Sequence, residues 1–161
     1  MTVTTRRAEP GDLDDLVRLS LGMETHYEPD GPPEPDEAAA RLKQNLFESD
    51  IGVSAILAFD DGNAAGVAFI CPLFPADRLG TSLYLKDVFV SAGMRGRGIG
   101  RTLLRAVIRH ARDNGHTRVD WSTMSSNTGA QRLYRDFGAR QQEQMMFRVL
   151  REDFAARLEE D

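Results

Sequence analysis

Residues 88–100 pass from an apolar run through a glycine- and arginine-rich segment into a helical pattern, and no other feature constrains the fold as strongly. The segment reads Val-Phe-Val-Ser-Ala-Gly-Met-Arg-Gly-Arg-Gly-Ile-Gly. Glycines at the alternate positions 96, 98 and 100 leave the loop amides accessible. The helix that follows adds its unpaired N-terminal N–H groups and the positive end of its dipole. We therefore predict a strand–loop–helix unit that binds an anion.

The apolar pattern of the whole chain predicts an α/β fold. Apolar runs with turn residues between them indicate strands at 3–7, 53–59, 65–70, 83–90, 118–123 and 145–150. Apolar stripes at helical spacing indicate helices that begin after Asp12, after Asp36, at Ile99 and after Asn127. The order βααβββαβαβ favours a mixed sheet with helices on both faces. A chain of 161 residues suits a single domain, residues 1–161, with one core.

Two local patterns make this prediction more specific. In the first helix the stripe comprises Leu13, Leu16, Val17 and Leu21, and Leu19 lies outside it. Residues 60–63, Asp-Asp-Gly-Asn, have turn chemistry and predict a hairpin between the second and third strands.

Composition excludes several classes of protein. No window approaches the roughly 18 uninterrupted apolar residues of a membrane span, and the first ten residues do not resemble a signal peptide. We therefore expect a cytoplasmic protein without a membrane partner. Cys71 is the single cysteine, so an internal disulfide is excluded. The spacing of His26, His110 and His116 is not that of a metal cluster, so we expect no metal.

Charge is distributed unevenly along the chain. The net charge of −5 argues against a nucleic-acid partner. Six arginines and no acid occupy residues 95–112, whereas six acids and no Lys or Arg occupy residues 24–37. Such runs are more often solvated faces than sites. The position of the arginines beside the glycine loop favours a role with an anion.

The loop matches neither of two common nucleotide-binding motifs. A dinucleotide fingerprint needs G-x-G-x-x-G, but Arg101 stands where its third glycine is required. A P-loop needs Gly-Lys followed by Ser or Thr, which the segment lacks. Taken alone, the glycine run is equally consistent with a tight strand-to-helix turn.

With its surroundings, the chain resembles the GNAT superfamily of acyl-CoA-dependent N-acetyltransferases. The family hallmark, Arg/Gln-x-x-Gly-x-Gly/Ala between a strand and a helix, is matched by Arg95, Gly98 and Gly100. A second element, an Asn that opens a helix with a Tyr in it and a Gly at its end, is matched by Asn127, Tyr134 and Gly138. The resemblance is strong over residues 83–139.

The resemblance implies a donor, acetyl-CoA, and a place for it. In this interpretation the loop amides hold the pyrophosphate, which agrees with the anion site inferred from the loop itself. The central strand would splay from the next strand, so that its exposed backbone groups pair with the pantetheine arm and the acyl carbonyl. The expected donor-binding residues are Val88, Phe89, Val90, Arg95, Gly96, Arg97, Gly98, Ile99, Gly100, Arg101 and Asn127.

Acyl transfer from a thioester to an amine needs a neutral amine, a stabilised oxyanion and a leaving thiolate. By resemblance, Tyr134 protonates the CoA thiolate; the alternative is a tyrosine that only packs in the core. Asn127 either bonds the pantetheine arm or acts as an ordinary N-cap. Asp87, Glu24 and Glu28 are candidates for the base, with Asp87 first because it lies beside the expected splay.

The strand at residues 84–90 also resembles that of spermidine/spermine acetyltransferases, but Lys86 and Ser126 stand where that branch has Glu and Trp. The acids near Glu24 and Glu28 favour a small cationic amine as acceptor: an amino sugar, a diamine or a basic amino acid. The resemblance also implies that the protein could be a homodimer. The competing hypothesis is a non-catalytic acyl-CoA-binding sensor with the same fold and loop.

Overall fold

The computed structural model describes residues 3–27 and 31–158 of the chain. Residue contacts divide the chain into two compact units, Met1–Ser125 and Ser126–Asp161. Glu28, one of the expected acceptor-binding residues, lies outside the described residues. No helix in the described part of the chain is long and apolar enough to cross a membrane.

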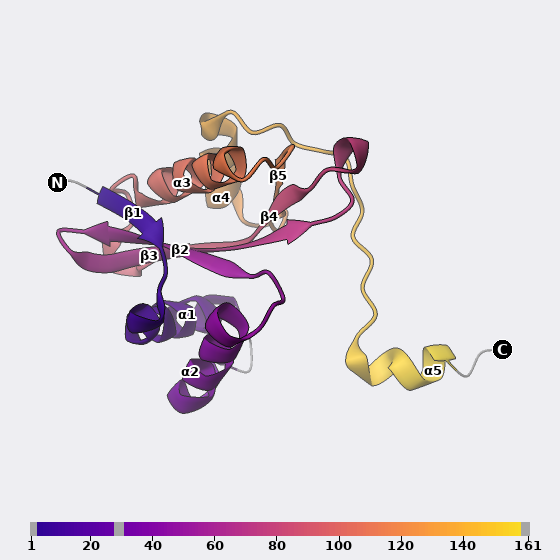
Figure 1. Ribbon diagram of the computed structural model, residues 1–161, viewed down its shortest axis with the longest axis horizontal. Helices are drawn as coiled ribbons and strands as arrows, with labels where there is room; N and C mark the ends of the chain where they lie inside the picture. The colour runs from indigo at the N-terminus through magenta and orange to yellow at the C-terminus, as the bar shows by residue number, and fades with distance from the viewer. Residues whose placement is uncertain (1–2, 28–30, 159–161) are drawn as a thin grey trace. The chain divides into compact units, whose positions relative to one another are not determined.

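The first unit is a five-stranded mixed sheet with helices on both faces, as the sequence predicts (Figure 1). Its sheet order is β1-β2-β3-β4-β5; the first four strands pair antiparallel, and β5 pairs parallel to β4. Figure 1 shows α1 and α2 on one face and α3 on the other. The elements are β1 (Val3–Arg7), α1 (Leu13–Tyr27), α2 (Pro35–Lys43), β2 (Ser54–Asp60), β3 (Asn63–Leu73), β4 (Ser82–Val90), α3 (Ile99–Asp113) and β5 (Val119–Asp120).

The buried side of α1 differs from the predicted one. Leu16, Leu19 and Met23 are buried in a cluster with residues of β2, β3 and β4. Leu13, Val17 and Leu21 are only half-buried, so the placement of Leu19 outside the stripe was wrong. A helix rich in leucine offers more than one row at spacings of three and four residues. Which row becomes buried is decided by the sheet that the helix packs on.

Two helix starts also differ from the predicted caps. The carboxylate of Asp12 accepts a hydrogen bond from the Glu9 amide at 2.8 Å and pairs with Arg6 at 2.6 Å, within a 3-10 turn that precedes α1. In α2 the N-cap is Glu34, and Pro35 is the first helical residue, because the fixed φ of proline suits that position.

Helix α3 presents its apolar side to the sheet. Its buried residues are Ile99, Leu103, Leu104, Ala106, Val107 and Ala111. The arginines at 105, 109 and 112 are exposed. Gly115, with a φ of 73°, follows the helix end at Asn114. The apolar contact of α3 with β3 and β4 therefore fixes the position of the loop that precedes the helix.

Strand β4 changes its pairing midway. Phe69 of β3 pairs with Asp87, but the next residue, Ile70, pairs with Leu85. Lys86 is therefore an extra residue, a β-bulge that reverses the face toward which the following side chains project. On the other edge, β4 pairs with β5 only at Leu83 and Tyr84. Beyond Tyr84, β4 is paired with other described strands on one edge only.

The second unit contains helix α4 (Thr128–Phe137) and a short helix α5 (Phe154–Leu158). The predicted closing strand at residues 145–150 is not formed: residues 139–150 have no regular secondary structure, and the side chains of 140–150 are exposed. A strand is stable only when a neighbour satisfies its backbone groups, and no described strand pairs with this segment. The predicted element order is otherwise confirmed, with the strand at 118–123 shortened to two residues.

Candidate active site

The loop between β4 and α3 has the conformation that its glycines suggested. After Val90 the chain makes a short 3-10 turn at Ala92–Met94. Gly96 and Gly98 then both adopt a left-handed conformation with φ of 79°. This conformation costs a residue with a Cβ about 1–2 kcal/mol. Glycine at these two positions thus lets the loop turn sharply into α3.

The amides of the loop are a second feature of this segment. Within the described chain, no backbone or side-chain acceptor takes a hydrogen bond from the amides of residues 96–100. Gly98 is the N-cap of α3 and carries no side chain to cap it, so the helix dipole adds positive potential there. Such an arrangement of free amides at a helix N-terminus is suited to an anion, so the predicted binding of the pyrophosphate here stays a prediction. We call residues 95–101 the amide loop.

Two of the three arginines of the amide loop, Arg95 and Arg97, turn in different directions. The Nε of Arg95 donates to the carbonyl of Val90 at 3.2 Å, and its guanidinium lies over the Phe89 ring at 5.9 Å. Arg97 instead donates from Nη1 to Oδ2 of Asp60 at 3.1 Å. Asp60 is the last residue of β2 and is only 4% exposed. Arg95 thus braces the end of β4, and Arg97 ties the loop to the sheet.

The strand edge beside the loop is where the resemblance implied a splay. Val88, Phe89 and Val90 pair with β3 on one edge, and β5 does not reach them on the other. Phe89 is 8% exposed and packs in the cluster under α1, while its backbone remains part of this edge. The side chain of Phe89 is therefore part of the core, whatever its backbone binds.

The candidate acids lie on different elements. Asp87 is half-buried in β4, next to the bulge, and its Oδ2 is 3.3 Å from the Nζ of Lys86. Glu24 is half-buried in the last turns of α1. The structure thus brings Asp87, residues 88–90 and the amide loop together along one strand and its exit.

Asn127 and Tyr134 belong to the second unit. The Oδ1 of Asn127 accepts a hydrogen bond from the Ala130 amide at 3.1 Å, so Asn127 is the N-cap of α4. Tyr134 is half-buried in α4, and Gly138 ends the helix with a φ of 91°. The N-cap and the helix end are confirmed. The contribution of both side chains to donor binding and catalysis stays a prediction.

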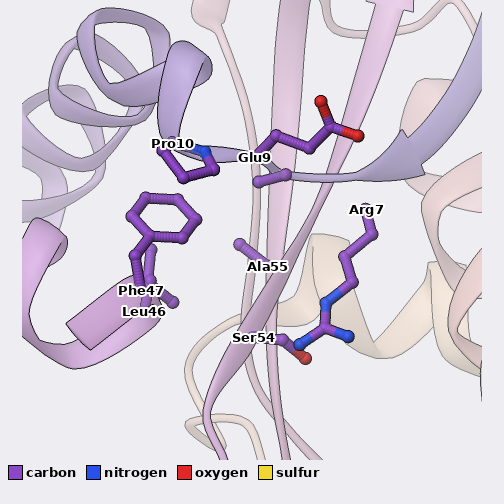
Figure 2. A pocket seen from close by; sticks show the side chains of 8 residues that line it. Arg7, Glu9, Pro10, Leu46, Phe47, Ser54 and Ala55 are labelled. Atoms are coloured by element: carbon purple, nitrogen blue, oxygen red, sulfur yellow. The ribbon is translucent and has the colours of Figure 1, made fainter. Parts of the chain in front are cut away.

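Two surface cavities lie in the first unit. One, about 360 Å³, is lined by Arg18, Gly22, Phe89 and Arg95 among others, next to the exit of β4. The other, about 320 Å³, is lined by residues of β1, of β2 and of the π-helical turn Gln44–Glu48 that follows α2, among others. Figure 2 shows Phe47 and Pro10 at one side of it and the guanidinium of Arg7 at the other. Because β2 and β4 run parallel, this second cavity lies at the sheet end opposite the amide loop.

Two features of the site were missed in the sequence. Asp60 was interpreted only as part of a turn, and no local pattern separates a buried aspartate from an exposed one there. Gly66, in β3, packs closely against the carbonyl of Phe89 and against α3. An isolated glycine inside a strand signals such a close approach, so Gly66 could have been found.

The fold and the site define an α/β protein with a glycine-rich strand–loop–helix unit and a central strand that β5 pairs only at its start. The chain belongs to the acetyltransferase (GNAT) family, whose sequence pattern matches residues 19–139. This identifies the family suggested by the amide loop and by Asn127, Tyr134 and Gly138.

Two named N-acetyltransferases and one solved structure are similar to this chain. An L-ornithine N5-acetyltransferase from Arabidopsis thaliana is 31% identical over 80 residues, which cover 50% of this chain and 35% of that protein. A glucosamine 6-phosphate N-acetyltransferase from Oryza sativa subsp. japonica is 31% identical over 117 residues, 70% of either chain. The structure of an integron cassette protein from V. cholerae has a TM-score of 0.87 at 28% identity, covering 100% of this chain and 99% of that one.

Proposed function

We propose that the protein transfers an acetyl group from acetyl-CoA to the primary amine of a small cationic acceptor, by direct attack in a ternary complex. The observation that carries the proposal is the amide loop at the exit of a strand whose second edge is open. A pyrophosphate on residues 95–101 and a pantetheine arm along Val88–Val90 would occupy both features at once.

The chemistry requires one proton to be removed and one to be supplied. The amine nitrogen attacks the thioester carbonyl carbon, a tetrahedral oxyanion forms, and the C–S bond breaks to release the CoA thiolate. We assign Tyr134 as the group that gives its hydroxyl proton to that thiolate. A phenol, with a reference pKa of about 10, is protonated at neutral pH and can act as this acid.

We assign the removal of the amine proton to Asp87. Its half-buried carboxylate lies on β4 beside the open edge, where the acetyl carbonyl would be held. The Nζ of the neighbouring Lys86 lies 3.3 Å from Oδ2 of this carboxylate. Asn127 would bind the pantetheine arm through its Nδ2, since its Oδ1 already caps α4.

We assign recognition of the acceptor's positive charge to Glu24 and Glu28. Ornithine, named in one relative, has two amino groups and a net positive charge, which supports a basic amino acid as acceptor. Glucosamine 6-phosphate, named in another relative, also carries a primary amine, but its phosphate makes it net anionic. The likeness to the spermidine/spermine branch stays a prediction. The exposed Lys86 argues against a polyamine as the acceptor, because it places a positive charge on β4.

We also propose that both units serve one acetyltransferase domain, because the family match runs from residue 19 to 139 across their boundary. A homodimer remains part of the proposal. Exposed apolar side chains of the second unit, among them Met145, Phe147 and Leu158, support it. Sedimentation equilibrium would test the dimer, and a monomer at micromolar concentration would refute it.

Release of free CoA thiol from acetyl-CoA over a panel of amines tests the function. We expect turnover with cationic amines, including L-ornithine and glucosamine as probes, and less with acceptors of net negative charge. Preference for anionic acceptors would contradict the roles of Glu24 and Glu28. Tight CoA binding without turnover on any amine would favour the acyl-CoA sensor instead.

A further inference from the structure

Asp60 and Arg97 form a salt bridge between the end of β2 and the amide loop, 37 positions apart in the chain. The side chain of Asp60 is almost fully buried, whereas that of Arg97 is 44% exposed. Only Oδ2 of the carboxylate is bonded; Oδ1 is buried and has no hydrogen-bond partner in the described part of the chain. Arg97 is thus the cation that compensates this buried charge.

This arrangement is costly for a purely structural contact. Removing a carboxylate from water is unfavourable, and a partner that bonds only one oxygen compensates it incompletely. Residues at the end of a hairpin strand can usually reach solvent, and the neighbouring Asp61 is exposed. A buried, half-satisfied carboxylate next to a ligand-binding loop therefore calls for an explanation other than stability.

The position of Asp60 in the sheet supplies an explanation for this buried carboxylate. In β2, Ala55 and Leu57 face the α1 cluster, so alternation turns Asp60 toward the opposite face, which α3 covers. Arg97 lies two residues before Ile99, where α3 begins. The carboxylate therefore holds the side chain of a residue that belongs to the amide loop itself.

We infer that Asp60 is a positioning residue, which orients the Arg97 guanidinium toward the pyrophosphate of the donor; the inference rests on the proposed function. Arg97 gives one N–H of Nη1 to Asp60, and a guanidinium has five N–H donors in all. Holding the side chain in one rotamer lowers the entropy that would be lost when the phosphate binds. Asp60 thus acts only on ligands that carry the pyrophosphate.

Equilibrium binding of CoA and of pantetheine, which lacks the pyrophosphate, tests the role of Asp60. For Asp60→Asn we expect the Kd for CoA, measured by calorimetry, to rise about tenfold, which corresponds to the loss of one charge-assisted interaction. The Kd for pantetheine, followed by NMR titration because this ligand binds weakly, should change less than about twofold. A merely structural role would weaken both ligands alike.

Asp113→Asn is the matched control, because it breaks an exposed ion pair with Arg112 at the other end of α3. It should leave both Kd values unchanged. If Asp60→Asn does not fold, Arg97→Lys replaces it: a lysine still pairs with Asp60 but loses the guanidinium's multiple donors, so CoA should bind about threefold or more weakly.

The outcomes distinguish a failure of the Asp60 role from a failure of the proposed function. The role of Asp60 alone would be overturned if the wild type binds CoA and Asp60→Asn binds it with the same Kd. It would also be overturned if Asp60→Asn weakens the binding of CoA and pantetheine equally. Absence of CoA binding by the wild type would overturn the proposed function and, with it, this inference.

Discussion

Gly66 of β3 and Phe89 of β4 lie so close that a Cβ added to Gly66 would be 2.7 Å from the carbonyl oxygen of Phe89. The same Cβ would lie 3.1 Å from Leu103 and 3.3 Å from Ile99 of α3. Neither the strand nor the start of the helix can approach this closely over a larger residue. The position of the amide loop therefore depends on a hydrogen atom at residue 66.

We expect Gly66→Ala to lower the free energy of unfolding by about 1–3 kcal/mol, because the backbone of β4 and the start of α3 must move apart. Chemical denaturation measures this change. Gly11→Ala is the control, since its added Cβ meets nothing within 4 Å, and it should change stability by less than about 0.5 kcal/mol. Equal effects of the two substitutions would contradict the close approach.

Gly98→Ala should weaken CoA binding more than it weakens the fold. The left-handed φ of 79° at this N-cap is strained for alanine by about 1–2 kcal/mol, so the loop amides would turn away from the ligand. Gly93→Ala, in the same connection and with open space around its Cβ, is the matched control. Calorimetric titration with CoA gives both affinities, and identical values would refute the amide loop as the binding site.

Tyr134→Phe tests the proposed acid. We expect kcat to fall by about a hundredfold or more, because the thiolate would leave without a proton, while the Kd for CoA stays within about twofold. Steady-state thiol release and calorimetry provide the two readouts. Unchanged turnover would exclude the proton-donor role and leave Tyr134 as a packing residue of α4.

His110 should make the fold sensitive to pH below neutrality. Burial lowers the pKa of its imidazole below the ordinary value of 6.5, and the charge of Arg7 and the nearby His116 lower it further. Just below pH 6.5 the unfolded chain therefore binds more protons than the folded one, so the free energy of unfolding falls as the pH drops toward the folded pKa.

Chemical denaturation at pH 7.5 and at pH 5.5 measures this pH dependence. The free energy of unfolding should fall less between the two pH values for His110→Asn than for the wild type. Asp12 and Asp113 do not interfere in this window. Hydrogen bonds from Arg6 and Arg112 lower the pKa of Asp12 and of Asp113 below 3.8, so their contributions are lost only in stronger acid. Equal losses for both proteins would refute the role of His110.

Much of the candidate site could be predicted because it is built from short segments. The left-handed Gly96 and Gly98, the start of α3 at Ile99 and the N-cap at Asn127 each depend on neighbours within one or two turns. The order of strands and helices followed from apolar periodicity for the same reason. The assigned roles of Tyr134, Asp87 and Glu24 stay predictions, since they concern a donor and an acceptor.

The sequence by itself thus determined the local conformations: the turn of the amide loop, the amphipathic α3 and the capped α4. The tertiary structure alone decided that Leu19 is buried, that the carboxylate of Asp60 holds Arg97, and that Gly66 must be small. It also decided that residues 145–150, apolar enough for a strand, form none in the described structure. The physical reason is the same throughout: burial and strand pairing depend on partners distant in the chain, which no local pattern specifies.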